Sequence, residues 1–188
     1  MSRLTIFKDD APGVPLLSTD DAAAIARELA KVGVRFERWQ VANPPPFEAD
    51  NETVLKTYRP HLDRLMAGAG YGTADVIRLT PETPNLDAIR QKFLSEHTHT
   101  EDEVRFFVHG SGNFVLHLAG KVFDAHCTAG DLISVPTGTK HWFDGGASPR
   151  CVVLRVFTDT SGWAAHYTGD AIAEKFPVVT QDPAPKAA

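Results

Sequence analysis

The chain has 188 residues, a formal net charge of −5 and 43% hydrophobic residues. This length suits one domain with a sizeable core, and the hydrophobic fraction is too high for a disordered chain. The mild acidic excess argues against nucleic acid as a partner, because binding to phosphates needs a basic surface. We expect no membrane partner either, since no apolar run is long enough to span a bilayer.

The N-terminus lacks the long apolar segment of a secretory signal, which favours a cytoplasmic location. The two cysteines, Cys127 and Cys151, are then expected to be reduced thiols, although the sequence leaves a disulfide between them open. Residues 181–188 are polar and rich in Pro and Ala, so we expect them to form a flexible tail.

The first half of the chain is predicted to be mainly helical, with a few short strands. Helices are expected at 18–33, 51–66 and 85–94, and strands at 3–7, 33–40 and 76–79. Ser18 or Thr19 offers an N-cap for the first helix. Pro60 is expected to kink or interrupt the second helix, because proline has no N–H to donate to the preceding turn.

From residue 103 onward the chain changes character. Short segments rich in Val, Phe and Leu alternate with Gly, Asp and Pro turns, which is typical of an antiparallel sandwich or barrel. We therefore predict a mainly β fold in one domain over residues 1–180. Its β-barrel body should cover about 97–160, and the helices of region 18–95 should pack outside it.

A cluster of metal-binding residue types begins at the same point. His97 and His99 are separated by one residue, so in an extended segment their side chains point to the same side. Glu103 follows where the next strand is expected to begin, and His141 begins a strand after a turn containing Pro and Gly. Because neighbouring antiparallel strands would bring these four side chains together inside a barrel, we predict that they bind one divalent metal.

The ligand set restricts the choice of metal. Imidazole with carboxylate suits Fe, Ni, Mn, Co or Zn. Four protein ligands would close a tetrahedral zinc site, but they leave two positions on an octahedral ion, enough for a bidentate substrate. This favours Fe(II), Ni(II) or Mn(II). Glu101 and Asp102 compete with Glu103 as the carboxylate, whereas His109, His117 and His126 are expected to be ordinary hydrogen-bonded side chains.

These segments resemble the paired motifs of the cupin superfamily. The motif HxHxxxE, followed after six residues by Gly, is matched by His97, His99, Glu103 and Gly110. The motif GxxxxxPxGxxH is matched by Gly130, Pro136, Gly138 and His141. This spacing selects Glu103 over its two neighbours. Two turn positions depart from the family pattern: Gln91 replaces a leading Gly, and Gly145 replaces a closing Asn.

Within the cupins, HTHTEDEVRFFVHGSGNF and VPTGTKHWFD resemble the acireductone dioxygenases of methionine salvage, and the likeness covers residues 1–180. It implies a double-stranded β-helix (jelly-roll) barrel with one Fe(II) or Ni(II) per chain and no organic cofactor. The implied substrates are O2 and the acireductone 1,2-dihydroxy-3-keto-5-methylthiopentene. In this family the iron form gives 4-methylthio-2-oxobutanoate and formate, and the nickel form gives methylthiopropionate, formate and carbon monoxide.

Arg105 is the predicted catalytic residue. It lies two residues beyond Glu103, so a strand places both side chains on one face. A buried Arg needs a negative partner, and a substrate dianion on the metal would provide one. By resemblance, the matching Arg helps to generate that dianion. The alternative is an Arg in a surface salt bridge.

Four further residues are predicted to line the substrate pocket: Phe106, Phe143, Arg155 and Trp163. For the aromatic residues the alternative is ordinary core packing. Glu96 and Asp102 flank the ligands and are predicted to orient the imidazoles from behind, with a solvated charge as the alternative. By resemblance, the matching acids are linked to metal incorporation.

Other functions fit the metal motif as well. A cupin could be a manganese decarboxylase or a sugar isomerase, or a sensor without catalytic activity. A sensor would usually carry a pair of DNA-binding helices, and the sequence contains no basic helix. We therefore expect a monomeric enzyme that acts on a small molecule, and oxygen consumption with an acireductone would separate these alternatives.

Overall fold

The computed structural model describes residues 1–158 and 164–176. Twelve strands are found within these ranges: β1 (Arg3–Lys8), β2 (Pro15–Thr19), β3 (Arg35–Arg38), β4 (Thr73–Leu79), β5 (His97–Thr98), β6 (Glu103–His109), β7 (Ser111–Leu118), β8 (Lys121–Thr128), β9 (Asp131–Val135), β10 (Lys140–Asp144), β11 (Cys151–Phe157) and β12 (His166–Tyr167). The helices in the same ranges are α1 (Ala22–Ala30), α2 (Asn51–Ala69), α3 (Leu86–Leu94) and α4 (Ile172–Lys175).

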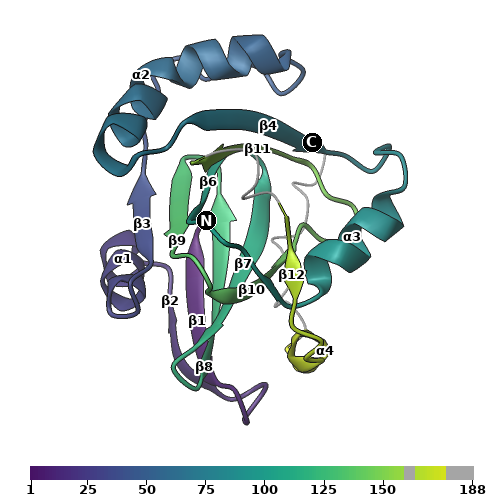
Figure 1. The fold of residues 1–188 in the computed structure, drawn as a ribbon. Helices are drawn as coiled ribbons and strands as arrows, with labels where there is room; N and C mark the ends of the chain where they lie inside the picture. The colour runs from purple at the N-terminus through teal and green to yellow at the C-terminus, as the bar shows by residue number, and fades with distance from the viewer. Residues whose placement is uncertain (159–163, 177–188) are drawn as a thin grey trace, which may run out of the picture.

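The strands form two antiparallel sheets that enclose the main core (Figure 1). One sheet has the order β12-β5-β10-β7-β8-β1-β2, and the other has the order β3-β9-β6-β11-β4. Phe114, Leu116 and Phe123 of the first sheet pack against Phe107 and Ile133 of the second. This arrangement confirms the predicted double-stranded β-helix, with the helices of the first half outside the barrel.

The outer faces of the sheets are covered separately. Helix α2 lays Val54, Tyr58 and Leu62 over the outward side chains of β6, β9 and β11, among them Phe106. Helix α4 covers the outer face of the other sheet, where Ile172 contacts the cluster that contains Trp142. Burial on both faces explains why the central strands are almost continuously apolar. No helix in the described part of the chain is long and apolar enough to cross a membrane.

The helix starts show where local sequence signals compete. The predicted cap of the first helix at Ser18 or Thr19 is wrong, because both residues belong to β2. Asp21 caps α1 instead, and its side chain accepts a hydrogen bond of 2.6 Å from the backbone N–H of Ala24. The second helix continues through Pro60, so this proline does not interrupt it. The predicted tail, 181–188, lies outside the described residues.

Candidate metal centre and active-site pocket

Three histidines meet at one end of the barrel interior. His97 on β5 lies directly opposite His141 on β10 in the antiparallel pairing of these strands. His99 follows two residues after His97 and is on the same side, as the period of an extended chain requires. One ring nitrogen from each histidine can be chosen so that all three lie within 4.8 Å of one another. All three side chains are buried.

Backbone carbonyls fix the orientation of each imidazole. The Nδ1 atoms of His97, His99 and His141 lie 2.7, 2.8 and 2.8 Å from the carbonyl oxygens of Ser95, Ala164 and Thr139. A carbonyl oxygen can only accept, so each Nδ1 carries the proton and each Nε2 presents a lone pair. The three Nε2 atoms are therefore in the state in which imidazole binds metals.

Burial favours the neutral form of His97 and His99. Desolvation lowers the pKa of His97 from 6.5 to about 4, and the neighbouring His141 acts in the same direction. Desolvation also lowers the pKa of His99. Protons therefore do not compete for the lone pairs of His97 and His99 near neutral pH.

Glu103, at the start of β6, completes the cluster. Its Oε2 lies 2.8 Å from Nε2 of His141, and its Oε1 lies 3.7 Å from Nε2 of His99. Burial alone would raise the pKa of Glu103, but Arg105, His141 and His99 together outweigh it, so the pKa is lowered. Glu103 is thus a carboxylate that faces the three imidazoles.

The donor set fits a metal ion. Neither Oε2 of Glu103 nor Nε2 of His141 has a hydrogen-bond partner of acceptable geometry among the described residues. Two buried atoms that both carry lone pairs would repel each other at 2.8 Å unless a cation or a proton lies between them. The Nδ1 proton of His141 is already used by Thr139. A divalent cation bound by nitrogen and oxygen atoms satisfies all of these groups.

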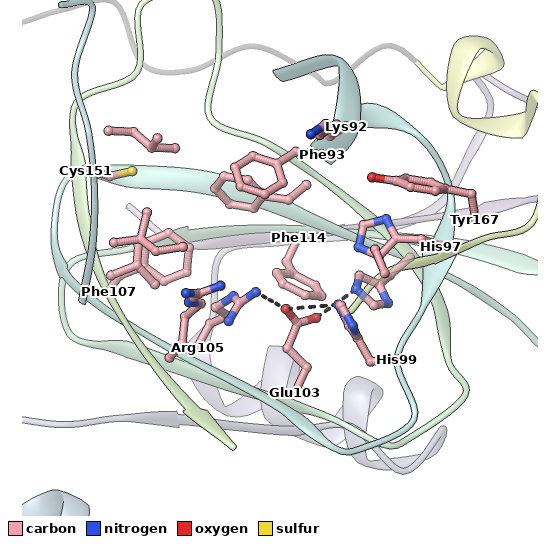
Figure 2. Close-up of a pocket in the computed structure, with 17 residues that line it drawn as sticks. Lys92, Phe93, His97, His99, Glu103, Arg105, Phe107, Phe114, Cys151 and Tyr167 are labelled. Atoms are coloured by element: carbon pink, nitrogen blue, oxygen red, sulfur yellow. Dashed lines mark ion pairs between the residues drawn. The ribbon is translucent and has the colours of Figure 1, made fainter. Parts of the chain in front are cut away.

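The cluster forms the polar end of a cavity of about 290 Å³ (Figure 2). The opposite end is apolar and is lined by Ile77, Leu79, Phe107, Phe143, Cys151 and Val153. Figure 2 places Cys151 and Phe107 on the side of the cavity away from His97. Lys92 of α3 and Tyr167 of β12 also line the cavity. A ligand with a chelating polar head and an apolar tail matches this division.

Two arginines lie side by side in the cavity wall. Arg105 on β6 is the direct partner of Arg155 on β11, and like charges in this position repel. Each is paired with an acid: Arg105 with Glu103, and Arg155 with Asp75, where the Nε to Oδ1 distance is 2.8 Å. Arg105 also has a buried nitrogen, Nη1, without a hydrogen-bond partner in the described part of the protein.

The predicted pocket residues have different outcomes. Phe143 and Arg155 line the cavity, as expected. Phe106 does not: it faces α2, where its ring lies 4.9 Å from the ring of Tyr58. The reason is the strand period, which turns Phe106 outward because Glu103 and Arg105 point inward. Phe107, the neighbouring aromatic residue, lines the cavity instead and was not among the predicted pocket residues. Trp163 lies outside the described residues.

The two flanking acids, Glu96 and Asp102, do not contact the imidazoles of the metal site. The carboxylate of Glu96 is bound by Nδ1 of His117 at 2.6 Å and by the Thr168 hydroxyl at 2.5 Å. Asp102 is exposed and accepts a 2.9 Å hydrogen bond from the backbone N–H of Thr137. The prediction that these acids orient the imidazoles is wrong, because backbone carbonyls orient them. Glu96 instead fastens the segment that carries β12.

The three histidines predicted to be ordinary hydrogen-bonded side chains, His109, His117 and His126, are indeed hydrogen-bonded. His109 lies 2.6 Å from the carbonyl oxygen of Pro45 through Nε2. Nδ1 of His126 lies 3.0 Å from Oδ1 of Asn113. His117 is bound to Glu96 as described above. The two cysteines are both buried and free, so they do not form the disulfide that the sequence left open.

Comparison with known proteins agrees with this geometry. The ARD/ARD' family profile matches residues 3–165. An acireductone dioxygenase from Granulibacter bethesdensis is 67% identical over 94% of this chain and 99% of its own length. One from Gluconacetobacter diazotrophicus is 64% identical over 95% and 99%. A solved acireductone dioxygenase from Bacillus anthracis, with a cadmium ion in its active centre, has a TM-score of 0.80 and 32% identity over 89% of this chain and 98% of its own. The chain therefore belongs to the acireductone dioxygenase family.

Proposed function

We propose that this protein is a metal-dependent dioxygenase that cleaves the acireductone 1,2-dihydroxy-3-keto-5-methylthiopentene with O2. The observation that carries the proposal is the convergence of three Nε2 lone pairs and one ionised carboxylate at the polar end of a cavity. His97, His99, Glu103 and His141 would hold one Fe(II) or Ni(II), and no organic cofactor is needed. The cadmium ion in the active centre of the Bacillus anthracis relative supports a divalent site in this family.

The number of ligands suits the substrate. Four protein donors on an octahedral ion leave two positions, which match two neighbouring oxygens of an acireductone. When bound, such an ion provides a Lewis-acidic anchor for these oxygens and a redox partner for O2. The protein contributes the shape of the site, the orientation of the ligands and a cavity with a largely apolar lining.

Arg105 is placed to act on the substrate rather than on the ion. One of its nitrogens pairs with Glu103, and its buried Nη1 is free for a further acceptor. An enediolate oxygen at the polar end would take that position. The positive charge would favour loss of the enediol protons and hold the resulting anion in place. Arg155 adds a second positive charge in the wall, although Asp75 offsets it.

The apolar end would bind the methylthio side chain of the substrate. The six side chains that form the apolar end carry no charge. Cys151 stays a neutral thiol because burial raises its pKa to about 11. Binding of the apolar side chain there would fix which carbons of the enediol-ketone part face O2. The products would then depend on how the metal holds this part of the substrate. Iron would give formate with 4-methylthio-2-oxobutanoate, and nickel would give formate, carbon monoxide and methylthiopropionate.

We further propose that the protein is a single domain over residues 1–180. It would act as a cytoplasmic monomer on small molecules and would bind neither nucleic acid nor a membrane. The free thiols of Cys127 and Cys151 support a reducing compartment.

The experiment is metal exchange on the purified protein. The metal is stripped with a chelator, Fe(II) or Ni(II) is restored separately, and the acireductone is supplied with O2. Iron enzyme should give formate and the keto acid without carbon monoxide, and nickel enzyme should release carbon monoxide. Identical products from both forms would refute the metal-dependent outcome. Absence of O2 uptake with either metal would refute the dioxygenase assignment.

A further inference from the structure

The ring of Phe143 forms part of the apolar end of the cavity and lies against two glycines. A Cβ atom built on Gly112 would be 2.4 Å from Cζ and 2.5 Å from Cε2 of this ring. A Cβ on Gly145 would be 3.5 Å from Cε1 and 3.9 Å from Cζ. The tip of the ring therefore occupies the space that a side chain at position 112 would need. At position 145 the ring would be in van der Waals contact with the added Cβ, and Pro149 Cβ would be nearer, at 3.2 Å.

The backbone does not require glycine at either position. Among the glycines of this region, Gly110 and Gly146 have positive φ angles, whereas Gly112 and Gly145 do not. Gly112 lies within β7, where glycine weakens a strand and commonly marks a close approach of another group. The approaching group here is Phe143, so the contact accounts for the missing side chain.

The remaining neighbours of the ring limit where it can move. Phe93 meets it edge-on at a centroid distance of 6.0 Å, and Phe107 and Phe114 lie at 6.4 and 6.3 Å. Gly112 shares the inward face of β7 with Phe114, because they are two residues apart. A methyl group at 112 therefore points into the barrel. It would push the ring away from β7 and into the cavity.

We propose that Gly112, with Gly145 on the other side of the ring tip, forms a seat for Phe143, and that Gly112 fixes the depth of the apolar end and hence the length of acireductone side chain that the enzyme accepts. This inference rests on the proposed function, because it takes the apolar end as the site of the substrate side chain. Phe143 would contact the side chain directly, whereas the two glycines act through Phe143.

The expected effect follows from the cost of one methylene in an apolar pocket. Such a pocket discriminates by about 10- to 200-fold per methylene. Gly112→Ala should therefore lower kcat/KM for the methylthioethyl substrate at least tenfold relative to an acireductone that carries only a methyl side chain. Phe143→Leu removes ring atoms from the cavity. It should shift the preference the other way, towards side chains longer than methylthioethyl.

The test uses the nickel- or iron-loaded enzyme and a series of acireductones whose side chains grow by one heavy atom at a time. The kcat/KM values are compared with dissociation constants from titrations without O2, which report binding alone. Gly68→Ala is the matched control, since a Cβ on this glycine of α2 meets nothing within 4 Å. In this control the preference for chain length should equal that of the wild type.

Loss of activity by the same factor for all substrates in Gly112→Ala would overturn the inference and leave the proposed function standing. If Gly112→Ala does not fold, Phe143→Leu alone tests the inference. In that case, an unchanged relative kcat/KM for substrates with longer side chains would overturn the inference. If the wild type cleaves no acireductone of any length, the proposed function fails and the inference falls with it.

Discussion

His141 and Glu103 hold two buried lone-pair atoms, Nε2 and Oε2, 2.8 Å apart. The hydrogen bond from Nδ1 of His141 to the Thr139 carbonyl turns Nε2 towards the Glu103 carboxylate. A divalent cation would bind both atoms through their lone pairs. Such a contact indicates that folding and ion binding are coupled.

The first prediction follows from this coupling. Removal of the metal should lower the melting temperature, because the ion binds the folded state and its ligands are brought together only there. At a free metal concentration of about 100 times Kd, the loss corresponds to about 2.7 kcal/mol. His141→Ala should lose most bound metal, as measured by elemental analysis. His109→Ala, which alters a histidine bound to Pro45, should retain it. Equal metal content in both variants would contradict the site.

The second prediction concerns Arg105. Arg105→Ala should keep its metal but lose about 10²- to 10³-fold in kcat, the usual effect of removing a donor from a developing anion. Arg105→Lys should restore only part, because an ammonium group cannot pair with Glu103 and a substrate oxygen in the same planar geometry. Steady-state kinetics with metal-normalised enzyme measure this. Near-normal turnover of Arg105→Ala would remove the residue from the mechanism.

The third prediction concerns Glu96. Its buried carboxylate accepts hydrogen bonds from His117 and Thr168, so Glu96→Leu removes the shortest hydrogen bond of each partner. We expect a loss of about 1 to 3 kcal/mol per unsatisfied group in chemical denaturation. Thr168→Val removes one partner only and should cost less. If Glu96→Leu is as stable as the wild type, Glu96 does not fasten the segment that carries β12.

The fourth prediction is a pH dependence of stability. Burial raises the pKa of the Cys151 thiol from 9.0 to about 11. Because the folded state prefers the neutral thiol, its contribution is complete below pH 9 and is lost as the pH rises towards 11. Cys151→Ala should flatten this part of the pH profile of unfolding free energy. In the native wild type at pH 8, iodoacetamide should leave both cysteines unmodified, whereas the unfolded chain should react.

Strand periodicity explains how much of the site could be predicted. The spacing of His97 and His99, and of Glu103 and Arg105, places each pair on one face, and the structure has both pairs facing the cavity. The same rule, applied one residue further, would have assigned Phe107 in place of Phe106. The barrel itself follows from the regular short apolar strands of the second half.

Other features have no signature in the local sequence. Strand β2 (Pro15–Thr19) is short and exposed, so neither periodicity nor burial indicates it. Asp21 and Thr19 are both suitable caps, and only the pairing of β2 with β1 decides between them. Ala164 acts through its backbone carbonyl, which every residue possesses. A contact between residues 65 positions apart depends on the whole fold.

The carbonyl of Ala164 has a consequence for synthesis of the chain. The partners of His97 and His141 lie two residues earlier in the sequence, so these imidazoles can be oriented as soon as their own strands form. The partner of His99 is among the last residues of the family match, which ends at 165. A chain that stops before Ala164 carries all four donor side chains but lacks the acceptor that fixes the third imidazole. The complete, oriented donor set therefore becomes available only after residue 164 has been synthesised, so products that stop earlier lack the finished metal site.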